Sequence, residues 1–478
     1  MMHSGIETPE RGRTMRIAAL LLSLLLALPA TLAAREPAPA PPPFAVPGLI
    51  EAHLTPAHWI DALAAPDRVV LTPAQISAQN ARMQAEDPSI HDLEALPARI
   101  EGRQVRDWIE ALSALPERER FDVHGKPVTR GDLERIQAGL ALDAGPHSQP
   151  TRYGMVVRRA ALRAFPTRLR VFHSAGDTDI DRFQESALFP GDPLAIVHES
   201  RDGDWYFVVS QRYAAWIEKQ YVAEGDRDAI FAWGRRAPFL VVTGATARTA
   251  YTPERPGVSD VQLEMGVRVP VLSDWSPMEE VNGQLPAAAH VVELPVRGED
   301  GALSFAHALL PRSADVASDY LPMTEANIIR QAFKFLGERY GWGHSYNARD
   351  CSGFASEIYR SFNVLIPRNT SAQSVTPVLN RLPFSAEDSH DARVAALREA
   401  RPGDLVYIPG HVMMVIGHVD GEPVAIHDTS GMSWKPEGAD DLVRLHLNGV
   451  VVTPILPMMS NATTPTVDRI TSIQRIRP

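Results

Sequence analysis

Cys351 is the only cysteine of the chain, which has 478 residues. A single thiol cannot form a disulfide within the chain, nor half of a CxxC metal or redox site. The folded chain must therefore be stabilised by its apolar cores alone. A lone cysteine is either a small buried apolar side chain or a nucleophile, and the residues around Cys351 decide between these two roles.

The N-terminus has the pattern of a secretory signal peptide. Met15 and Arg16 are followed by an apolar run over residues 17–28 and by small residues up to Ala34. This order of a positive end, a short apolar segment and small residues is typical of a cleaved signal. We therefore expect residues 1–34 to be a signal peptide, with the true start at Met1 or Met15. The mature protein is then exported, periplasmic or extracellular, with no retained membrane anchor.

The length of the chain indicates the number of its domains, and its charge indicates which class of partner it does not bind. About three domains are expected for a chain of this length. The formal net charge of −11 argues against a nucleic-acid partner, which usually requires a basic face. Residues 35–47 are rich in proline and predict an extended linker.

Residues 48–148 predict a helical N-terminal domain. One helix begins with Thr72 as its N-cap and Pro73 at its first position. A second helix presents one buried face and ends at Pro116; that face consists of Val105, Trp108, Ile109, Leu112 and Leu115. The bland interpretation, a structural brace, is favoured for this region.

Two β-rich segments are expected next, at residues 149–232 and 233–318. Their short apolar runs, interrupted by Gly, Asp and Pro, are typical of small β barrels. Four positions of the first segment recur in the second: Leu188, Gly191, Leu194 and Ile196 match Leu263, Gly266, Val269 and Val271. This recurrence predicts two copies of one module. In a barrel this small, Trp205 and Trp216 are expected in the core rather than on a binding surface.

The last third of the chain places Cys351 at the start of a helix. Thr324 caps a preceding helix, whose apolar face leads to Gly337. After a glycine-rich aromatic loop at residues 340–344, Cys351 opens a second amphipathic helix with Phe354 and Ile358. The free amides and the positive dipole at a helix start favour a thiolate and can hold an oxyanion.

A general base for this thiol is expected on a strand. His411 opens an apolar strand, where it would lie against the helix start. His418 is an odd number of residues away and is the weaker candidate, because alternate strand residues point to opposite faces.

His427 ends the next expected strand and is the candidate partner of His411. The two histidines share a face only if the hairpin between them has an odd number of loop residues or a bulge. A loop centred on Val419 sets His427 directly opposite His411, whereas a loop at residues 420–422 pairs it with Val415. The sequence leaves both registers open.

Taken together, these residues resemble the NlpC family of bacterial cell-wall cysteine peptidases, which have a papain-like fold. The resemblance rests on Tyr340, Trp342 and Gly343, on residues 350–353, on residues 402–405 with His411 and Val412, on His427, and on Pro367, Arg368, Ser371 and Gln373. The order of the upstream segments resembles a multi-domain subgroup of this family. The implied fold is α+β, with a papain-like domain and C-terminal tail at residues 319–478 after two SH3-like barrels and a helical region.

The resemblance implies hydrolysis of the bond from γ-D-glutamate to a diamino acid in peptidoglycan stem peptides. Cys351 would be the nucleophile of this cysteine endopeptidase, His411 the base, and His427 the residue that orients it. Tyr340 would support the oxyanion. Asp350 and Ser352 would bind substrate, although helix capping explains both equally well. No metal or cofactor is expected, and the partner is peptidoglycan or its stem peptides.

Two departures and three open questions accompany this interpretation. His344 replaces the second glycine of the family signature, and the step from His411 to His427 is longer than usual. A related thiol amidase or acyltransferase, or a wall-binding protein with an idle peptidase domain, are the alternatives. The sequence does not fix intact wall or released peptide as substrate, the diamino acid, or the oligomeric state.

Overall fold

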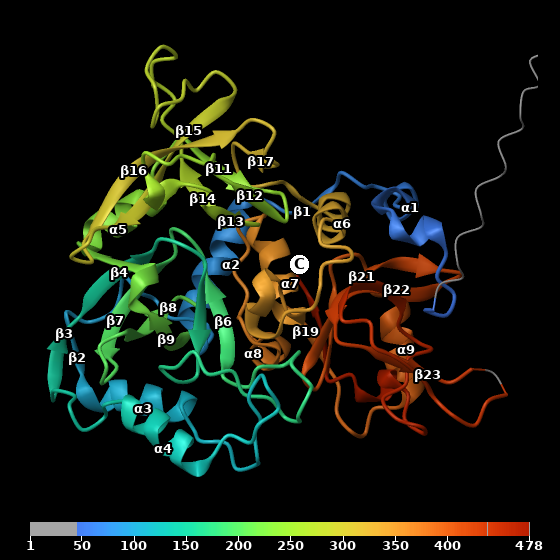
Figure 1. Ribbon diagram of the computed structural model, residues 1–478. Coiled ribbons are helices and arrows are strands. Elements are labelled where there is room, and N and C mark those ends of the chain that lie inside the picture. The colour runs from blue at the N-terminus through green and yellow to red at the C-terminus, as the bar shows by residue number, and fades with distance from the viewer. Residues whose placement is uncertain (1–44, 437, 478) are drawn as a thin grey trace, which may run out of the picture. The chain divides into compact units, whose positions relative to one another are not determined.

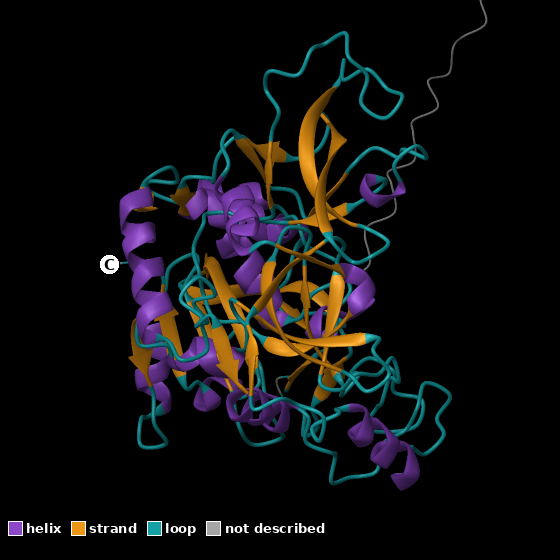
Figure 2. Ribbon diagram, turned by 90° about the vertical axis from the view of Figure 1, so that its left-hand side faces the viewer, coloured by secondary structure: helices purple, strands orange, loops and turns teal. Residues whose placement is uncertain are grey.

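The computed structural model describes residues 45–436 and 438–477. The predicted signal peptide and most of the predicted linker lie outside the described residues. No helix within the described part of the chain is long and apolar enough to cross a membrane. The described strands form a seven-stranded sheet, a six-stranded sheet and several sheets of two or three strands (Figure 2).

The N-terminal region is helical with three short strands. Its elements are η1 (Glu51–Leu54), α1 (Pro56–Asp61), β1 (Val69–Leu71), α2 (Pro73–Glu86), β2 (Arg99–Glu101), α3 (Gly102–Leu112), α4 (Arg130–Gly139) and β3 (Ser148–Pro150). The predicted start of α2 is confirmed: Thr72 Oγ1 accepts a hydrogen bond from the Gln75 amide, and the Gln75 side chain accepts one from the Thr72 amide.

Helix α3 ends at Leu112, so the predicted end at Pro116 is wrong. The reason is a tertiary contact, because Ser113 Oγ donates to the Ala164 carbonyl at 2.6 Å in a buried position just after the helix. Leu115 therefore lies beyond the helix. A side chain that satisfies a distant carbonyl fixes the local backbone more strongly than helix propensity does.

The buried apolar residues of this region divide between two cores. Trp59 and Met83 pack in the same core as Cys351 and Phe354. Ile100 and Ile109 pack instead with Trp216 and its neighbours in the first β-rich segment. The region therefore braces two parts of the molecule.

The first β-rich segment contains a seven-stranded sheet in the order β10-β4-β7-β8-β9-β5-β6. Its elements are β4 (Arg152–Val156), β5 (Ala160–Arg163), β6 (Gln184–Leu188), β7 (Pro193–Glu199), β8 (Trp205–Ser210), β9 (Ala214–Glu218), η2 (Lys219–Tyr221) and β10 (Val222–Gly225). Trp205 and Trp216 are buried in its core, as predicted.

The second β-rich segment has its own apolar core, built mainly from valines and leucines. It comprises α5 (Arg227–Arg235), β11 (Phe239–Val242), β12 (Thr246–Arg248), η3 (Pro256–Val258), β13 (Gln262–Glu264), β14 (Arg268–Pro270), β15 (Ala289–Arg297), β16 (Leu303–Pro311) and β17 (Val316–Ala317). The recurring glycines have the same local structure in both segments. Gly191 and Gly266 each have a positive φ, of 88° and 79°, in the turn between the two strands. Glycine adopts this conformation without a steric penalty.

The C-terminal domain is built on a six-stranded antiparallel sheet in the order β19-β26-β20-β21-β22-β25. Its elements are β18 (Met323–Thr324), α6 (Glu325–Phe333), η4 (Trp342–Asn347), α7 (Cys351–Arg360), α8 (Thr370–Val375), β19 (Asn380–Pro383), α9 (His390–Arg398), β20 (Leu405–Ile408), β21 (His411–Val419), β22 (Glu422–Thr429), β23 (Met432–Trp434), β24 (Val443–Leu445), β25 (Gly449–Pro454), η5 (Thr466–Arg469) and β26 (Ser472–Arg475). Helix α6 begins at the predicted cap, with Thr324 Oγ1 accepting from the Asn327 amide.

Helices α7 and α9 contribute to two different cores on this sheet. Phe354 of α7 packs with Met414 and Ile426. Leu397 of α9 packs instead with Met413 and Ala425, which directly precede Met414 and Ile426 in the two strands. Because alternate strand residues point to opposite faces, the two helices cover opposite faces of the sheet, and Figure 1 shows α7 beside β21 and β22.

The β21–β22 hairpin contains a bulge that neither predicted register included. Its turn consists of Asp420 and Gly421, and pairing shifts between Val415 and Gly417. The bulge supplies the extra residue that places His411 and His427 on one face, as the spacing required. Trp59 packs against the bulge: a Cβ added at Gly417 would lie 2.8 Å from the indole ring.

Candidate active site

Cys351 occupies the predicted position at the start of α7. Asp350 is the N-cap, and its Oδ1 accepts from the Gly353 amide at 2.7 Å. The thiol is buried, and its Sγ lies 3.8 Å from Thr370 Oγ1 on α8. The backbone N–H of Val412 also acts on the sulfur. Cys351 therefore lies beside the first residues of β21.

The thiol is protonated at neutral pH. Burial, and to a smaller extent the Asp350 carboxylate, together raise the pKa of Cys351 to about 12. The Thr370 hydroxyl and the Val412 N–H have the opposite but smaller effect. The expectation that the helix start favours a thiolate is therefore wrong for the unliganded protein. A base must remove the proton before Cys351 can attack a carbonyl.

The structure brings His411 and His427 together. His411 Nε2 lies 2.6 Å from His427 Nδ1, and His427 Nε2 lies 2.9 Å from Thr453 Oγ1 on β25. Burial lowers the pKa of His411 to about 4, and burial and the adjacent His411 lower the pKa of His427. Both rings are thus neutral at pH 7. Within residues 45–436 and 438–477, no hydrogen bond joins Cys351 Sγ to either ring.

His418 and Tyr340 have surroundings of their own. His418 Nε2 is 3.4 Å from the Leu397 carbonyl of α9. Tyr340 is buried, and burial followed by the nearby Cys351 raises the pKa of its hydroxyl. The structure therefore places Tyr340 near the thiol. Its role in holding an oxyanion stays a prediction.

Asp350 is surrounded by donors from the protein itself. The donors are the Gly343 amide (3.0 Å), the Gly353 amide (2.7 Å), Ser352 Oγ (3.2 Å), and Arg368 Nη1 (3.1 Å) and Nη2 (2.8 Å). Burial raises the pKa of Asp350, but Arg368 and His344 outweigh it and hold the pKa at about 2. A carboxylate has about four lone-pair sites, and these donors fill them. The contact of Asp350 and Ser352 with substrate stays a prediction, and the capping role of Asp350 is observed.

His344, which replaces a family glycine, is part of a buried polar network. Its Nδ1 must accept, because it lies 2.8 Å from Arg368 Nη2, which can only donate. Nε2–H therefore donates to Glu357 Oε1 at 2.7 Å. Glu357 Oε2 accepts from Arg349 Nε at 2.6 Å, and Arg349 Nη1 donates to Glu338 at 2.7 Å. The network fixes the η4 loop to α7.

Both β-rich segments contact the loop that precedes Cys351. Gln184 of β6 donates to the Gly343 carbonyl at 2.7 Å, and Arg368 Nε donates to Ser186 Oγ at 2.8 Å. From the second segment, the Ala245 carbonyl accepts from Arg349 Nη2 at 2.8 Å. The two segments therefore help to position the start of α7.

Sequence reasoning missed three residues near the site. Thr370 contacts Cys351, and Thr453 contacts His427, but neither belongs to a motif, and both depend on long-range packing. Asp428 is fully buried, and neither of its carboxylate oxygens has a hydrogen-bond partner among the described residues. Its position directly after His427 was the one available signal. Burial and the nearby Asp350 raise the pKa of Asp428 to about 9.

This raised pKa predicts a pH-dependent stability. The folded protein keeps its proton on Asp428 up to about pH 9, whereas the unfolded chain releases it at about pH 3.9. The unfolded state therefore binds fewer protons between these values, and stability falls as pH rises through that window. Asp428→Asn removes this effect and is expected to be more stable than the natural protein, with a larger difference at pH 8 than at pH 5. Urea unfolding midpoints at both values measure it.

The exposed Asp228 offers a control for this experiment. Asp228→Asn is expected to change the midpoint little at either pH. A difference between Asp428→Asn and the natural protein that is the same at pH 5 and pH 8 would contradict a neutral buried carboxyl.

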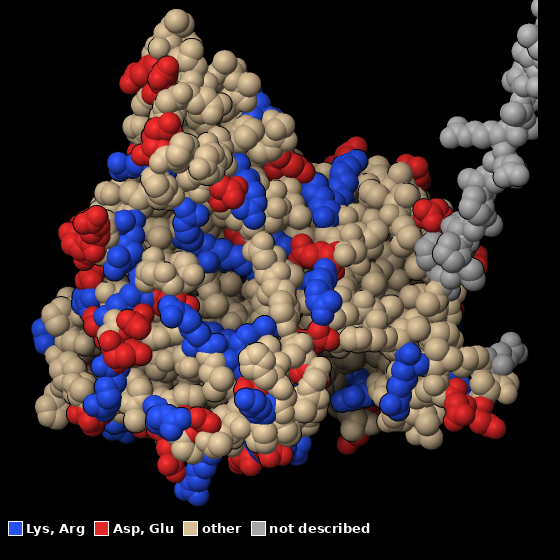
Figure 3. All heavy atoms as spheres, viewed as in Figure 1, with Lys and Arg blue, Asp and Glu red and all other residues tan. Residues whose placement is uncertain are grey.

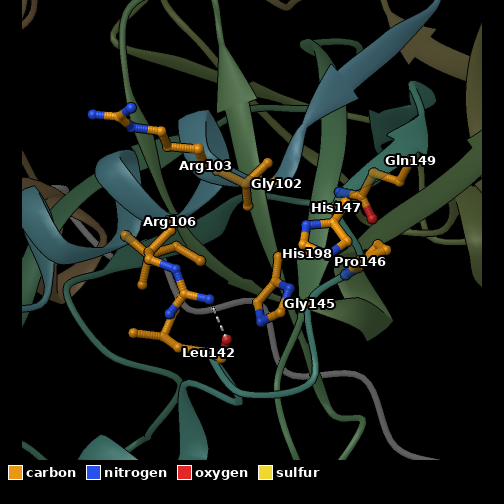
Figure 4. Close-up of a pocket in the computed structure, with 11 residues that line it drawn as sticks. Gly102, Arg103, Arg106, Leu142, Gly145, Pro146, His147, Gln149 and His198 are labelled. Carbon is orange, nitrogen blue, oxygen red and sulfur yellow. Dashed lines mark hydrogen bonds between the residues drawn. The ribbon is translucent and has the colours of Figure 1, made fainter.

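A cavity of about 300 Å³ lies away from these residues, between α3 and the loop that leads into β3 (Figure 4). Arg106 donates to the Leu142 carbonyl at 2.8 Å at its edge, and His147 and His198 also line it. None of the predicted site residues lines this cavity.

Comparisons with known proteins match the first β-rich segment and the C-terminal domain to two known families. Residues 170–218 match the SH3 domain of SH3b1 type, and residues 337–437 match the NlpC/P60 family. A γ-D-glutamyl-L-lysine dipeptidyl-peptidase of Bacillus cereus (strain ATCC 10987 / NRS 248) is 27% identical over 210 residues, which are 41% of this chain. The match spans 56% of that relative's length.

A solved NlpC/P60 endopeptidase from Photobacterium damselae subsp. piscicida has a similar fold. It superposes with a TM-score of 0.67 at 18% identity, covering 88% of this chain and 94% of the other. At this identity the likeness concerns the fold alone. Residues 337–437 are thus a domain of the NlpC/P60 family, and this domain follows an SH3 domain of SH3b1 type.

Proposed function

We propose that the protein is an exported cysteine peptidase that hydrolyses the γ-D-glutamyl to diamino acid bond of peptidoglycan stem peptides. The observation that carries this proposal is the pair of neutral imidazoles, His411 and His427, at the start of the strand whose Val412 N–H acts on the buried Cys351 thiol. The bond specificity is supported by the name of the Bacillus cereus relative. Localisation rests on the signal-like N-terminus.

The imidazole pair determines which nitrogen acts as the base. If His411 carries its proton on Nε2, it donates to His427 Nδ1 and leaves Nδ1 of His411 with a free lone pair. His427 Nε2–H then donates to Thr453 Oγ1. In this tautomer, His411 Nδ1 can take the proton of Cys351. The opposite tautomer has no free nitrogen on His411 and is inactive.

The reaction then proceeds in two steps. Cys351 Sγ forms a bond to the γ-carbonyl carbon of the D-glutamyl residue as its proton passes to His411, and His411 protonates the departing diamino-acid amine when the C–N bond breaks. In the second step a water molecule gives a proton to His411 and attacks the thioester carbonyl. The C–S bond then breaks, and His411 returns the proton to the departing Cys351 thiolate. In this proposal, Tyr340 O–H and the amides at the start of α7 stabilise the oxyanion.

We propose short released peptides rather than intact wall as the substrate. The contacts of Gln184 and Ser186 hold the first β-rich segment against the loop and helix that surround Cys351. A cross-linked glycan strand needs more open space around the thiol than a free tripeptide does. Both substrates can be compared directly in one assay.

The test is cleavage of L-Ala-γ-D-Glu-diaminopimelate by the exported chain, with products identified by mass spectrometry. We expect release of diaminopimelate by the natural protein, no release by Cys351→Ala, and a slower reaction with cross-linked peptidoglycan. Val375→Ala, an exposed position on the neighbouring helix α8, is the control and keeps full activity.

Two results would contradict the proposal. Cleavage by both the natural protein and Cys351→Ala, or by neither, would show that the Cys351 thiol is not the nucleophile of this reaction. Formation of a new amide with an added amine, in place of the free acid, would indicate an acyltransferase instead.

A further inference from the structure

A second cavity, of about 480 Å³, lies where α2, the first β-rich segment, α5 and the C-terminal end of α7 meet. Cys351, His411 and His427 do not line it. Its apolar walls include Phe231, Trp233 and Leu365. Figure 3 shows Lys and Arg side chains gathered around a hollow on this side of the molecule. The volume is in the range of small-molecule sites.

One arginine of this cavity lacks a partner. Arg212, in the turn between β8 and β9, has no side-chain hydrogen bond or ion pair with any residue that the structure describes. Its neighbours are different: Arg360 pairs with Asp192 at 2.6 Å, and Arg368 pairs with Asp350 at 2.8 Å. The acidic groups near Arg212 are therefore already engaged by other cations.

The surroundings of Arg212 also disfavour its positive charge. Burial, followed by the nearby Arg360, lowers the pKa of Arg212 to about 10, so the guanidinium remains charged at neutral pH. Arg212 is half-buried, and a cation held partly out of water without a counter-charge destabilises a folded protein, because the lost hydration is not replaced. Proteins retain such groups where a ligand supplies the missing charge.

Two further donors in the wall of the cavity point to the same ligand chemistry. Arg268 donates to the backbone carbonyls of Gly234 and Arg236 and has no carboxylate partner among the described residues. The Trp233 indole N–H is buried without an acceptor in the described part of the chain. The carboxylates that line the cavity already accept from other groups: Asp192 from Arg360, Glu94 from Arg235, and Asp92 from the amides of Glu94 and Ala95. The Arg212 guanidinium and the Trp233 indole N–H therefore remain as donors without an acceptor among the described residues.

We propose that this cavity binds a small ligand that carries an oxyanion, either a phosphate or a carboxylate, and that the group pairs with the Arg212 guanidinium. The planar fork of a guanidinium matches both kinds of oxyanion with two parallel hydrogen bonds. The apolar walls hold the remainder of the ligand. This site is separate from the proposed peptidase reaction and does not depend on it.

The test compares the natural protein with Arg212→Gln in a low-salt buffer free of phosphate and carboxylates. Without an added anion, Arg212→Gln is expected to unfold at a higher temperature than the natural protein, because an unpaired cation has been removed. Inorganic phosphate or citrate, added at matched ionic strength, is expected to raise the unfolding temperature of the natural protein. Calorimetric titration with the same anion is expected to give at least tenfold weaker binding to Arg212→Gln.

Arg130→Gln is the control, because the Arg130 side chain is 93% exposed on α4. It is expected to keep the anion response of the natural protein, and Arg212→Lys is expected to keep part of it. A response to phosphate alone or to citrate alone identifies the oxyanion. A lower unfolding temperature for Arg212→Gln, an equal response of both proteins, or no response of the natural protein to either anion would overturn the proposal.

Discussion

Replacement of His411 with alanine is expected to lower kcat/KM for stem-peptide cleavage by about 10²–10⁴-fold, the usual contribution of a general base. The effect is large because the Cys351 thiol is protonated at neutral pH and needs a base to become nucleophilic. His427→Ala is expected to give a smaller loss, since His427 acts by fixing the tautomer and orientation of the His411 ring. Initial rates with the tripeptide measure both effects.

The pH dependence provides a second measurement on the same residue. Burial lowers the pKa of His411 to about 4, so its base form exists above that pH. We expect kcat/KM to rise as pH increases through about 4 and then to remain level up to neutral pH. His418→Ala is the matched control and is expected to retain the natural rate and profile. An equal loss in His411→Ala and His418→Ala would contradict the assignment of the base.

Replacement of Glu357 with glutamine is expected to destabilise the protein by about 3–5 kcal/mol, the usual cost of removing one partner of a buried ion pair. Glu357 is fully buried and accepts from both Arg349 and His344, so the substitution leaves the Arg349 guanidinium without its second carboxylate. Urea unfolding at pH 7 measures the loss.

The matched control is Glu86→Gln, because Glu86 forms an ion pair with Arg82 on the surface of α2. An exposed pair of this kind contributes about 0–1 kcal/mol. Similar unfolding midpoints for the two variants would show that the Glu357 network is not a source of stability. Loss of cleavage by Glu357→Gln at temperatures where it remains folded would show that the network also positions the start of α7.

Features set by neighbouring residues were predicted well from the sequence. The N-caps Thr72 and Thr324, the helix that begins at Cys351 and the strand that begins at His411 each depend on a few adjacent side chains. The buried position of Trp216 follows from the size of the barrel, since a small β module has few other places for an indole.

Features that depend on contacts between distant segments could not be predicted from the sequence pattern. Thr453 reaches His427 because β25 pairs with β22. The end of α3 is set by the contact of Ser113 with Ala164, and the bulge in β21 lies against Trp59 from the opposite end of the chain. The pKa of Cys351 was predicted in the wrong direction, because a helix start reveals its amides in the sequence but not how deeply the thiol is buried.

The division of the N-terminal region between two cores has a consequence for the order of folding. Trp59 packs on Gly417, β1 pairs with β18, and Asn80 donates to the Asn363 carbonyl at 2.7 Å. These contacts join residues made first to residues made last, and such distant pairings form slowly. The segment that leaves the ribosome first therefore completes its structure only after nearly the whole chain has been made, and the peptidase domain produced alone would expose the surface that this segment covers.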